Sequence, residues 1–152
     1  MLNDSAAHLL LVEDNTNDGE LALRALRKCS LGDQVAWVTD GAEALAYVFG
    51  TSEDPQHRLR RAPKVILLDL KLPKVDGLEV LRQIKGDART RHIPVVVLTS
   101  SREEQDVIRT YQLGVNSYVV KPVDFEKFCE SVTKLGWYWL MLNQPPESVP
   151  AP

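Results

Sequence analysis

Val65-Ile66-Leu67-Leu68-Asp69 is the segment that indicates the fold most clearly, because four apolar residues in a row are followed by a single acid. An apolar run without polar alternation is typical of a strand that is buried on both faces of a parallel sheet. Three more runs have this form and are also followed by polar residues: Leu9–Val12 before Glu13-Asp14, Val95–Leu98 before Thr99, and Tyr118–Val120 before Lys121.

Strands and helices are expected to alternate along nearly the whole chain. The expected strands are 8–13, 35–38, 64–69, 94–99 and 117–120, and the expected helices cover 16–29, 41–49, 77–86, 102–113 and 125–142. Asn17 with Glu20, Asp40 with Glu43, and Ser101 with Glu104 are capping signals. Repeated strand-then-helix units predict an α/β fold, a doubly wound parallel sheet with helices on both faces.

Composition favours one soluble domain over residues 1–142. Residues 51–63 are expected to form an extended surface loop, and residues 143–152, which include four prolines, a disordered tail. The net charge of −3 and the lack of a cationic helix face disfavour nucleic-acid binding. No apolar run approaches the roughly 20 residues of a membrane span. We therefore expect a cytoplasmic protein whose Cys29 and Cys129 are reduced thiols.

The residues that follow the apolar runs are expected to meet at one edge of the sheet. In an open parallel sheet the strands' carboxyl ends lie together, and ligands bind in the crevice outside them. The side chains brought there are Glu13, Asp14, Asp69, Thr99 and Lys121.

These residue types suit phosphoryl chemistry with a divalent cation. Neighbouring carboxylates repel one another, so one pKa rises unless a cation is present. Oxygen ligands without histidine or cysteine favour Mg²⁺, or Mn²⁺, over zinc. A carboxylate beside the metal could act as a nucleophile in phosphoryl transfer, with Lys121 as a point charge and Thr99 as a hydroxyl donor.

The chain resembles the receiver domains of two-component response regulators over residues 8 to about 135. The matching motifs are Glu13-Asp14-Asn15, Asp69 with Pro73 and Asp76-Gly77, Thr99-Ser100, Gly114, and Tyr118 three residues before Lys121-Pro122. This resemblance implies a five-stranded flavodoxin-like sheet of order 2-1-3-4-5.

The resemblance also implies a phosphoryl acceptor, Asp69, and a magnesium site around it. Asp14 would bind the metal directly and Glu13 through water. Asp69 and the backbone carbonyl of Lys71 would complete the protein ligands.

Three further residues receive roles from the resemblance. Lys121 would pair with the phosphoryl oxygens, with a cis peptide bond before Pro122. Thr99 and Tyr118 would be the switch pair: Thr99 moves toward the phosphoryl group, and Tyr118 turns inward behind it.

A narrower resemblance is to the small stand-alone regulators that partner bacterial phytochromes. It rests on the loop before residue 64, on Arg60-Arg61-Ala62-Pro63, on Lys71-Leu72-Pro73-Lys74 and on the ending Leu135–Trp139. It implies a light-sensing histidine kinase as partner, and a homodimer with an interface at Trp137, Tyr138 and Trp139. With no output domain expected, the effect would pass to a binding partner or a downstream phosphotransfer protein.

Two other functions fit the motifs less well. Haloacid-dehalogenase-type phosphatases also use a strand-end aspartate, but they need a second aspartate two residues later, where this chain has Lys71. A degenerate receiver that acts as a constitutive interaction module would not need Asp69, Asp14, Thr99 and Lys121 together. The prediction is therefore a phosphorylatable signalling switch rather than an enzyme.

Overall fold

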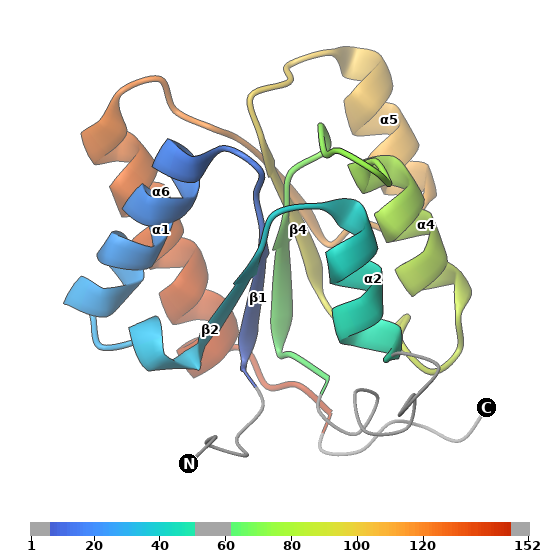
Figure 1. Cartoon of the computed structure of the whole chain (residues 1–152), viewed down its shortest axis with the longest axis horizontal. Coiled ribbons are helices and arrows are strands. Elements are labelled where there is room, and N and C mark those ends of the chain that lie inside the picture. The colour runs from blue at the N-terminus through green and yellow to red at the C-terminus, as the bar shows by residue number, and fades with distance from the viewer. Residues whose placement is uncertain (1–6, 51–61, 147–152) are drawn as a thin grey trace.

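Strands and helices alternate along the chain, as the apolar runs predict. The computed structural model describes residues 7–50 and 62–146 (Figure 1). The strands are β1 (Leu9–Val12), β2 (Val35–Val38), β3 (Val65–Leu68), β4 (Val95–Thr99) and β5 (Ser117–Val120). The helices are α1 (Thr16–Lys28), α2 (Gly41–Phe49), α4 (Gly77–Gly86), α5 (Glu104–Gln112) and α6 (Phe125–Trp137), with a 3₁₀ turn η1 (Gly32–Gln34) and a π-helical turn η2 (Tyr138–Leu142).

The five strands form one parallel sheet in the order β2-β1-β3-β4-β5. This confirms the predicted flavodoxin-like fold. The register aligns Val12 with both Val38 and Leu68, and Thr99 with Val120. The carboxyl ends of the central strands therefore lie at one edge, as the sequence predicts.

Alternate residues of the strands bury into two separate cores. One core lies between the sheet and helices α2 and α4, and contains Leu10, Val12, Ile66, Leu68, Val95 and Val97. The other lies between the sheet and helices α1 and α6, and contains Leu9, Leu11, Val65, Leu67, Val96 and Leu98. Figure 1 shows α1 and α6 on one side and α2, α4 and α5 on the other. Full burial of each leucine or isoleucine stabilises the fold by roughly 1.5–3 kcal/mol. The buried sheet is therefore a stable support for the residues that follow its strands.

One of the three capping pairs is confirmed and two are wrong. Asp40 caps α2, because its carboxylate accepts a hydrogen bond from the Glu43 amide at 2.7 Å. The cap of α1 is Asn15 rather than Asn17, since the helix already begins at Thr16 and the Asn15 Oδ1 accepts from the Asp18 amide.

The predicted Ser101–Glu104 capping box does not form. Helix α5 begins at Glu104, and its N-cap residue is Glu103, whose side chain makes no capping hydrogen bond. The Ser101 hydroxyl instead donates to the Asp106 carboxylate at 2.6 Å and accepts from the Glu103 amide. Ser101 therefore anchors the loop before α5 rather than the first turn of the helix.

The apolar ending is partly buried and partly exposed. Trp139 packs against the core under α1 and α6, with its ring edge-on to Tyr138 at a centroid distance of 5.0 Å. Trp137, Tyr138, Met141 and Leu142 are each about half exposed or more. The expected loop 51–63 lies outside the described residues except for its last two, and of the expected tail only residues 143–146 are described. None of the described helices is long and apolar enough to cross a membrane.

Candidate functional site at the carboxyl edge of the sheet

The strand-end residues converge on the ammonium group of Lys121. Its Nζ lies 2.5 Å from Glu13 Oε1, 3.0 Å from Asp69 Oδ2 and 3.0 Å from Asp18 Oδ2. Glu13, Asp69 and Lys121 are nearly buried, with side-chain exposures of 4%, 9% and 9%. Buried charges persist in a fold only when they are paired, and these are.

The electrostatics of the cluster reflect an excess of acid over base. Burial raises the pKa of Glu13 to about 7, against the opposing effect of the Lys121 ammonium. Burial alone would lower the pKa of Lys121, but the carboxylates of Glu13, Asp69 and Asp18 raise it above the ordinary lysine value. One cation thus serves several carboxylates, and a second positive charge would relieve their repulsion.

Glu13, Asp14 and Asp69 can supply ligands to one metal ion. One carboxylate oxygen from each lies within 4.8 Å of the other two. Two of these side chains are buried and Asp14 is exposed, so the cluster faces both the sheet and solvent. An all-oxygen set with one open side fits Mg²⁺ or Mn²⁺, which keep several water ligands.

Two backbone amides and one indole hold Glu13 and Asp69 in place. The Lys71 amide donates to Asp69 Oδ1 at 3.3 Å, and the Asn15 amide donates to Glu13 Oε2 at 3.2 Å. The indole of Trp37, on the neighbouring strand β2, donates to the backbone carbonyl of Glu13 at 2.9 Å. These contacts restrict the two carboxylates before any ligand arrives.

The peptide bond before Pro122 differs from what the resemblance implies. None of the peptide bonds in the part of the chain that the structure describes is cis, so the implied cis bond is not present. With this bond trans, the Lys121 ammonium still contacts the carboxylates of Glu13 and Asp69.

Thr99 and Tyr118 are linked through Ser101. Thr99 is fully buried, and its Oγ1 lies 3.4 Å from the Ser101 amide, which donates to it. The Tyr118 hydroxyl donates to the Ser101 carbonyl at 3.0 Å. Tyr118 is half-buried and packs against the core beside α2 and α4. The two predicted switch residues therefore contact the same loop residue, Thr99 at its amide and Tyr118 at its carbonyl.

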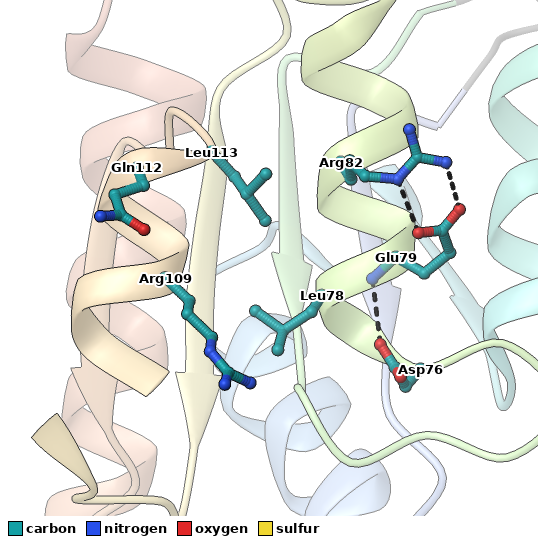
Figure 2. A pocket seen from close by; sticks show the side chains of 7 residues that line it. All are labelled: Asp76, Leu78, Glu79, Arg82, Arg109, Gln112 and Leu113. Carbon is teal, nitrogen blue, oxygen red and sulfur yellow. Dashed lines mark hydrogen bonds and ion pairs between the residues drawn. The ribbon is translucent and has the colours of Figure 1, made fainter. Parts of the chain in front are cut away.

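A separate groove lies between α4 and α5 (Figure 2). Its volume is about 340 Å³, and it is lined by Asp76, Leu78, Glu79, Arg82, Arg109, Gln112 and Leu113. On its α4 side the Arg82 guanidinium binds the Glu79 carboxylate and lowers the pKa of Glu79 to about 2. None of the strand-end residues lines this groove, so it does not belong to the carboxylate site.

Residues 9–133 match the response regulator receiver domain family. The chain belongs to this family. Receiver domains bind Mg²⁺, in agreement with the Glu13, Asp14 and Asp69 cluster. The family also assigns a general role to this receiver domain, that of a switch in two-component signalling.

The relatives of this receiver domain include phytochrome response regulators. It is 43% identical to "Probable methanogenesis regulatory protein FilR2" of Methanothrix harundinacea, over 91% of this chain and 86% of that protein. The bacteriophytochrome response regulator AtBRR is 56% identical and superposes with a TM-score of 0.67, covering 90% of this chain and 96% of AtBRR. The phosphorylated cyanobacterial phytochrome response regulator RcpA is 38% identical with a TM-score of 0.81, covering 91% and 97%. These similarities support a phytochrome-type response regulator.

Sequence reasoning missed one member of the cluster, Asp18. It lies in the first turn of α1, four residues after the Glu13-Asp14 pair, and its carboxylate binds Lys121. The signal that could have identified Asp18 was the N-cap of α1. With Asn15 as the N-cap residue, Asp18 is the third residue of the helix, in the turn nearest the end of β1.

Proposed function

We propose that this receiver domain accepts a phosphoryl group on Asp69 and thereby changes its surface for a partner. One observation carries the proposal: the buried Asp69 carboxylate shares the Lys121 ammonium with Glu13 and lies within reach of the same metal position as Glu13 and Asp14. A nucleophile, a cation for phosphoryl oxygens and a metal site therefore meet at one strand end.

The proposed transfer begins with attack by an Asp69 carboxylate oxygen on the phosphorus atom of the donor. The new O–P bond forms as the bond to the leaving group breaks, and the leaving group departs with that electron pair. The Lys121 ammonium is placed to neutralise the phosphoryl oxygens, since its Nζ already lies 3.0 Å from Asp69.

The metal would be held by Glu13, Asp14, Asp69 and the backbone carbonyl of Lys71. When bound, it would offset the negative charge that the donor and the carboxylates bring together. The residues fit such an ion because their oxygens already converge and no soft ligand stands among them.

Mg²⁺ at ten times its dissociation constant is expected to raise the melting temperature of the wild type by about 5 °C. Asp14→Ala should abolish this shift, because it removes the exposed ligand while leaving the buried pair of Glu13 and Lys121. Differential scanning fluorimetry checks this, with KCl of equal ionic strength as the control. An undiminished shift in Asp14→Ala would refute its role as a ligand.

The switch is proposed to run from Thr99 through Ser101 to Tyr118. Movement of the Thr99 hydroxyl toward a phosphoryl group would disturb its contact with the Ser101 amide, and the Ser101 carbonyl holds the Tyr118 hydroxyl. Tyr118 would then turn inward, which alters the surface of α5 and β5. A binding partner or a downstream phosphotransfer protein would detect that change.

The phosphodonor is proposed to be a phytochrome-type histidine kinase, because AtBRR and RcpA are phytochrome response regulators. An autophosphorylated bacteriophytochrome kinase should transfer its label to this chain at least tenfold faster than an unrelated histidine kinase. Time-resolved gels of the labelled proteins measure the two rates. Equal rates for both kinases would remove the support for a phytochrome partner.

A homodimer is proposed through the exposed surface of Trp137, Tyr138, Met141 and Leu142. Apolar exposure on this scale favours a protein interface. Trp139, the third residue of the predicted interface, is partly buried against the core, so it is not changed in the test.

The double variant Trp137→Ala, Leu142→Ala is expected to halve the molar mass measured by light scattering. A matched control is Ile108→Ala, Tyr111→Ala, which removes exposed apolar side chains from α5. A dimer that persists in the first variant and dissociates in the second would place the interface on α5.

The remaining predictions from the sequence stay predictions. They are a single domain over residues 1–142, a cytoplasmic location, no nucleic-acid partner, and no catalytic turnover beyond the domain's own phosphorylation and dephosphorylation. The family match over residues 9–133 supports the first of these.

A further inference from the structure

We propose that Asp18 is a positioning residue for phosphoryl transfer, which keeps the Lys121 ammonium at the site after Glu13 and Asp69 are engaged by metal and phosphoryl group. The proposal rests on the function proposed above. It starts from the observation that Asp18 Oδ2 lies 3.0 Å from Lys121 Nζ, although 103 residues separate the two in sequence.

The ammonium group of Lys121 is saturated by its three partners. An ammonium has three N–H donors, and the three acceptors are Glu13, Asp18 and Asp69. They come from three different elements, namely the end of β1, the first turn of α1 and the end of β3. The position of Lys121 is thus set jointly by the sheet and by α1.

Phosphorylation would change two of these three partners. Glu13 and Asp69 belong to the proposed metal-binding set, and formation of the acyl phosphate removes the carboxylate charge of Asp69. A bound dication would also repel the nearby ammonium. Asp18 is not one of the three carboxylates that can bind the metal, so it would still hold Lys121 while two N–H groups turn to the phosphoryl oxygens.

Asp18 is held in place by α1 and contacts the Lys121 ammonium from the solvent side of the site. Its backbone amide donates to the Asn15 cap at 3.0 Å, which fixes the first turn of α1. Its side chain is 31% exposed, against 9% for Lys121. The contact is therefore a partly solvated ion pair, with an effect on rate rather than an absolute requirement.

The test compares phosphorylation rates at saturating small-molecule phosphodonor and Mg²⁺. Asp18→Ala should lower the rate about fivefold, as expected for one charge-assisted hydrogen bond at a partly exposed site. Asp18→Asn keeps an acceptor oxygen without the charge, and should lower it about twofold. Glu20→Gln, which removes one exposed charge from the same helix, should match the wild type.

A double-mutant cycle with Lys121→Ala separates positioning from a purely structural effect. If Asp18 acts through Lys121, Asp18→Ala will change the slow residual rate of Lys121→Ala by less than a factor of 1.5. An equal fivefold loss in both backgrounds, or no loss in either, would overturn the inference while wild-type labelling stands. An unlabelled wild type would overturn the proposed function itself and this inference with it.

Discussion

Asp69→Asn will take up no phosphoryl group from a small-molecule donor under conditions that label the wild type once per chain. The amide that replaces the carboxylate is not a nucleophile toward phosphorus. Intact-protein mass spectrometry, with a mass increase of one phosphoryl group, gives the measurement.

The loss in Asp69→Asn will not come from unfolding. Lys121 keeps Glu13 and Asp18 as partners, and the removal of one carboxylate reduces repulsion within the cluster. The matched control is Asp33→Asn, in the 3₁₀ turn before β2 at the opposite edge of the sheet, which should be labelled like the wild type. Label on Asp69→Asn at the wild-type rate would refute the acceptor assignment.

Gly77→Ala is expected to destabilise the fold by about 2–3 kcal/mol. A methyl group at this position would overlap the Asp69 carbonyl oxygen and the Leu70 backbone. Backbone cannot rotate aside as a flexible side chain does. The Gly77 amide also donates to the Leu70 carbonyl at 2.8 Å, so the clash falls on a hydrogen bond that joins α4 to the acceptor loop.

Urea unfolding of Gly77→Ala, with the slope compared to the wild type, measures this loss. Gly86→Ala is a matched control at the other end of α4, because a methyl group there meets nothing within 4 Å. It should be neutral or stabilising by up to about 1 kcal/mol. Equal stability of the two variants would contradict this prediction, because it would show that the backbone of Asp69 and Leu70 can shift to accommodate the methyl group at low cost. Slower phosphorylation of Gly77→Ala than of Gly86→Ala is expected too, since the clash moves Asp69.

Most of the site could be predicted because a parallel sheet places the carboxyl ends of its strands at one edge. Glu13, Asp69 and Lys121 each follow a run of buried residues, and parallel strands place such residues at one edge whatever the helix packing. The buried runs needed no tertiary knowledge, since an apolar stretch without alternation has few other uses in a soluble chain.

Contacts made by helices were harder to predict. Asp18 contacts Lys121 because of how α1 packs on the sheet, and helical periodicity does not specify that packing. The same limit applies to Trp139. Its neighbours Trp137 and Tyr138 look equally apolar in sequence, and only the tertiary packing shows that Trp139 is the one that contacts the core.

The order of residues was enough to predict the parallel sheet, its two helical layers and the carboxylate, hydroxyl and lysine residues at its edge. It was enough because burial on both faces leaves a continuous apolar signature and because chain direction fixes which end of each strand is shared. The tertiary structure alone decided how Lys121 divides its three hydrogen bonds, and that Ser101 joins Thr99 to Tyr118. These contacts depend on distances of about 3 Å between residues that are mostly far apart in the chain. Such distances are set by the packing of the helices on the sheet.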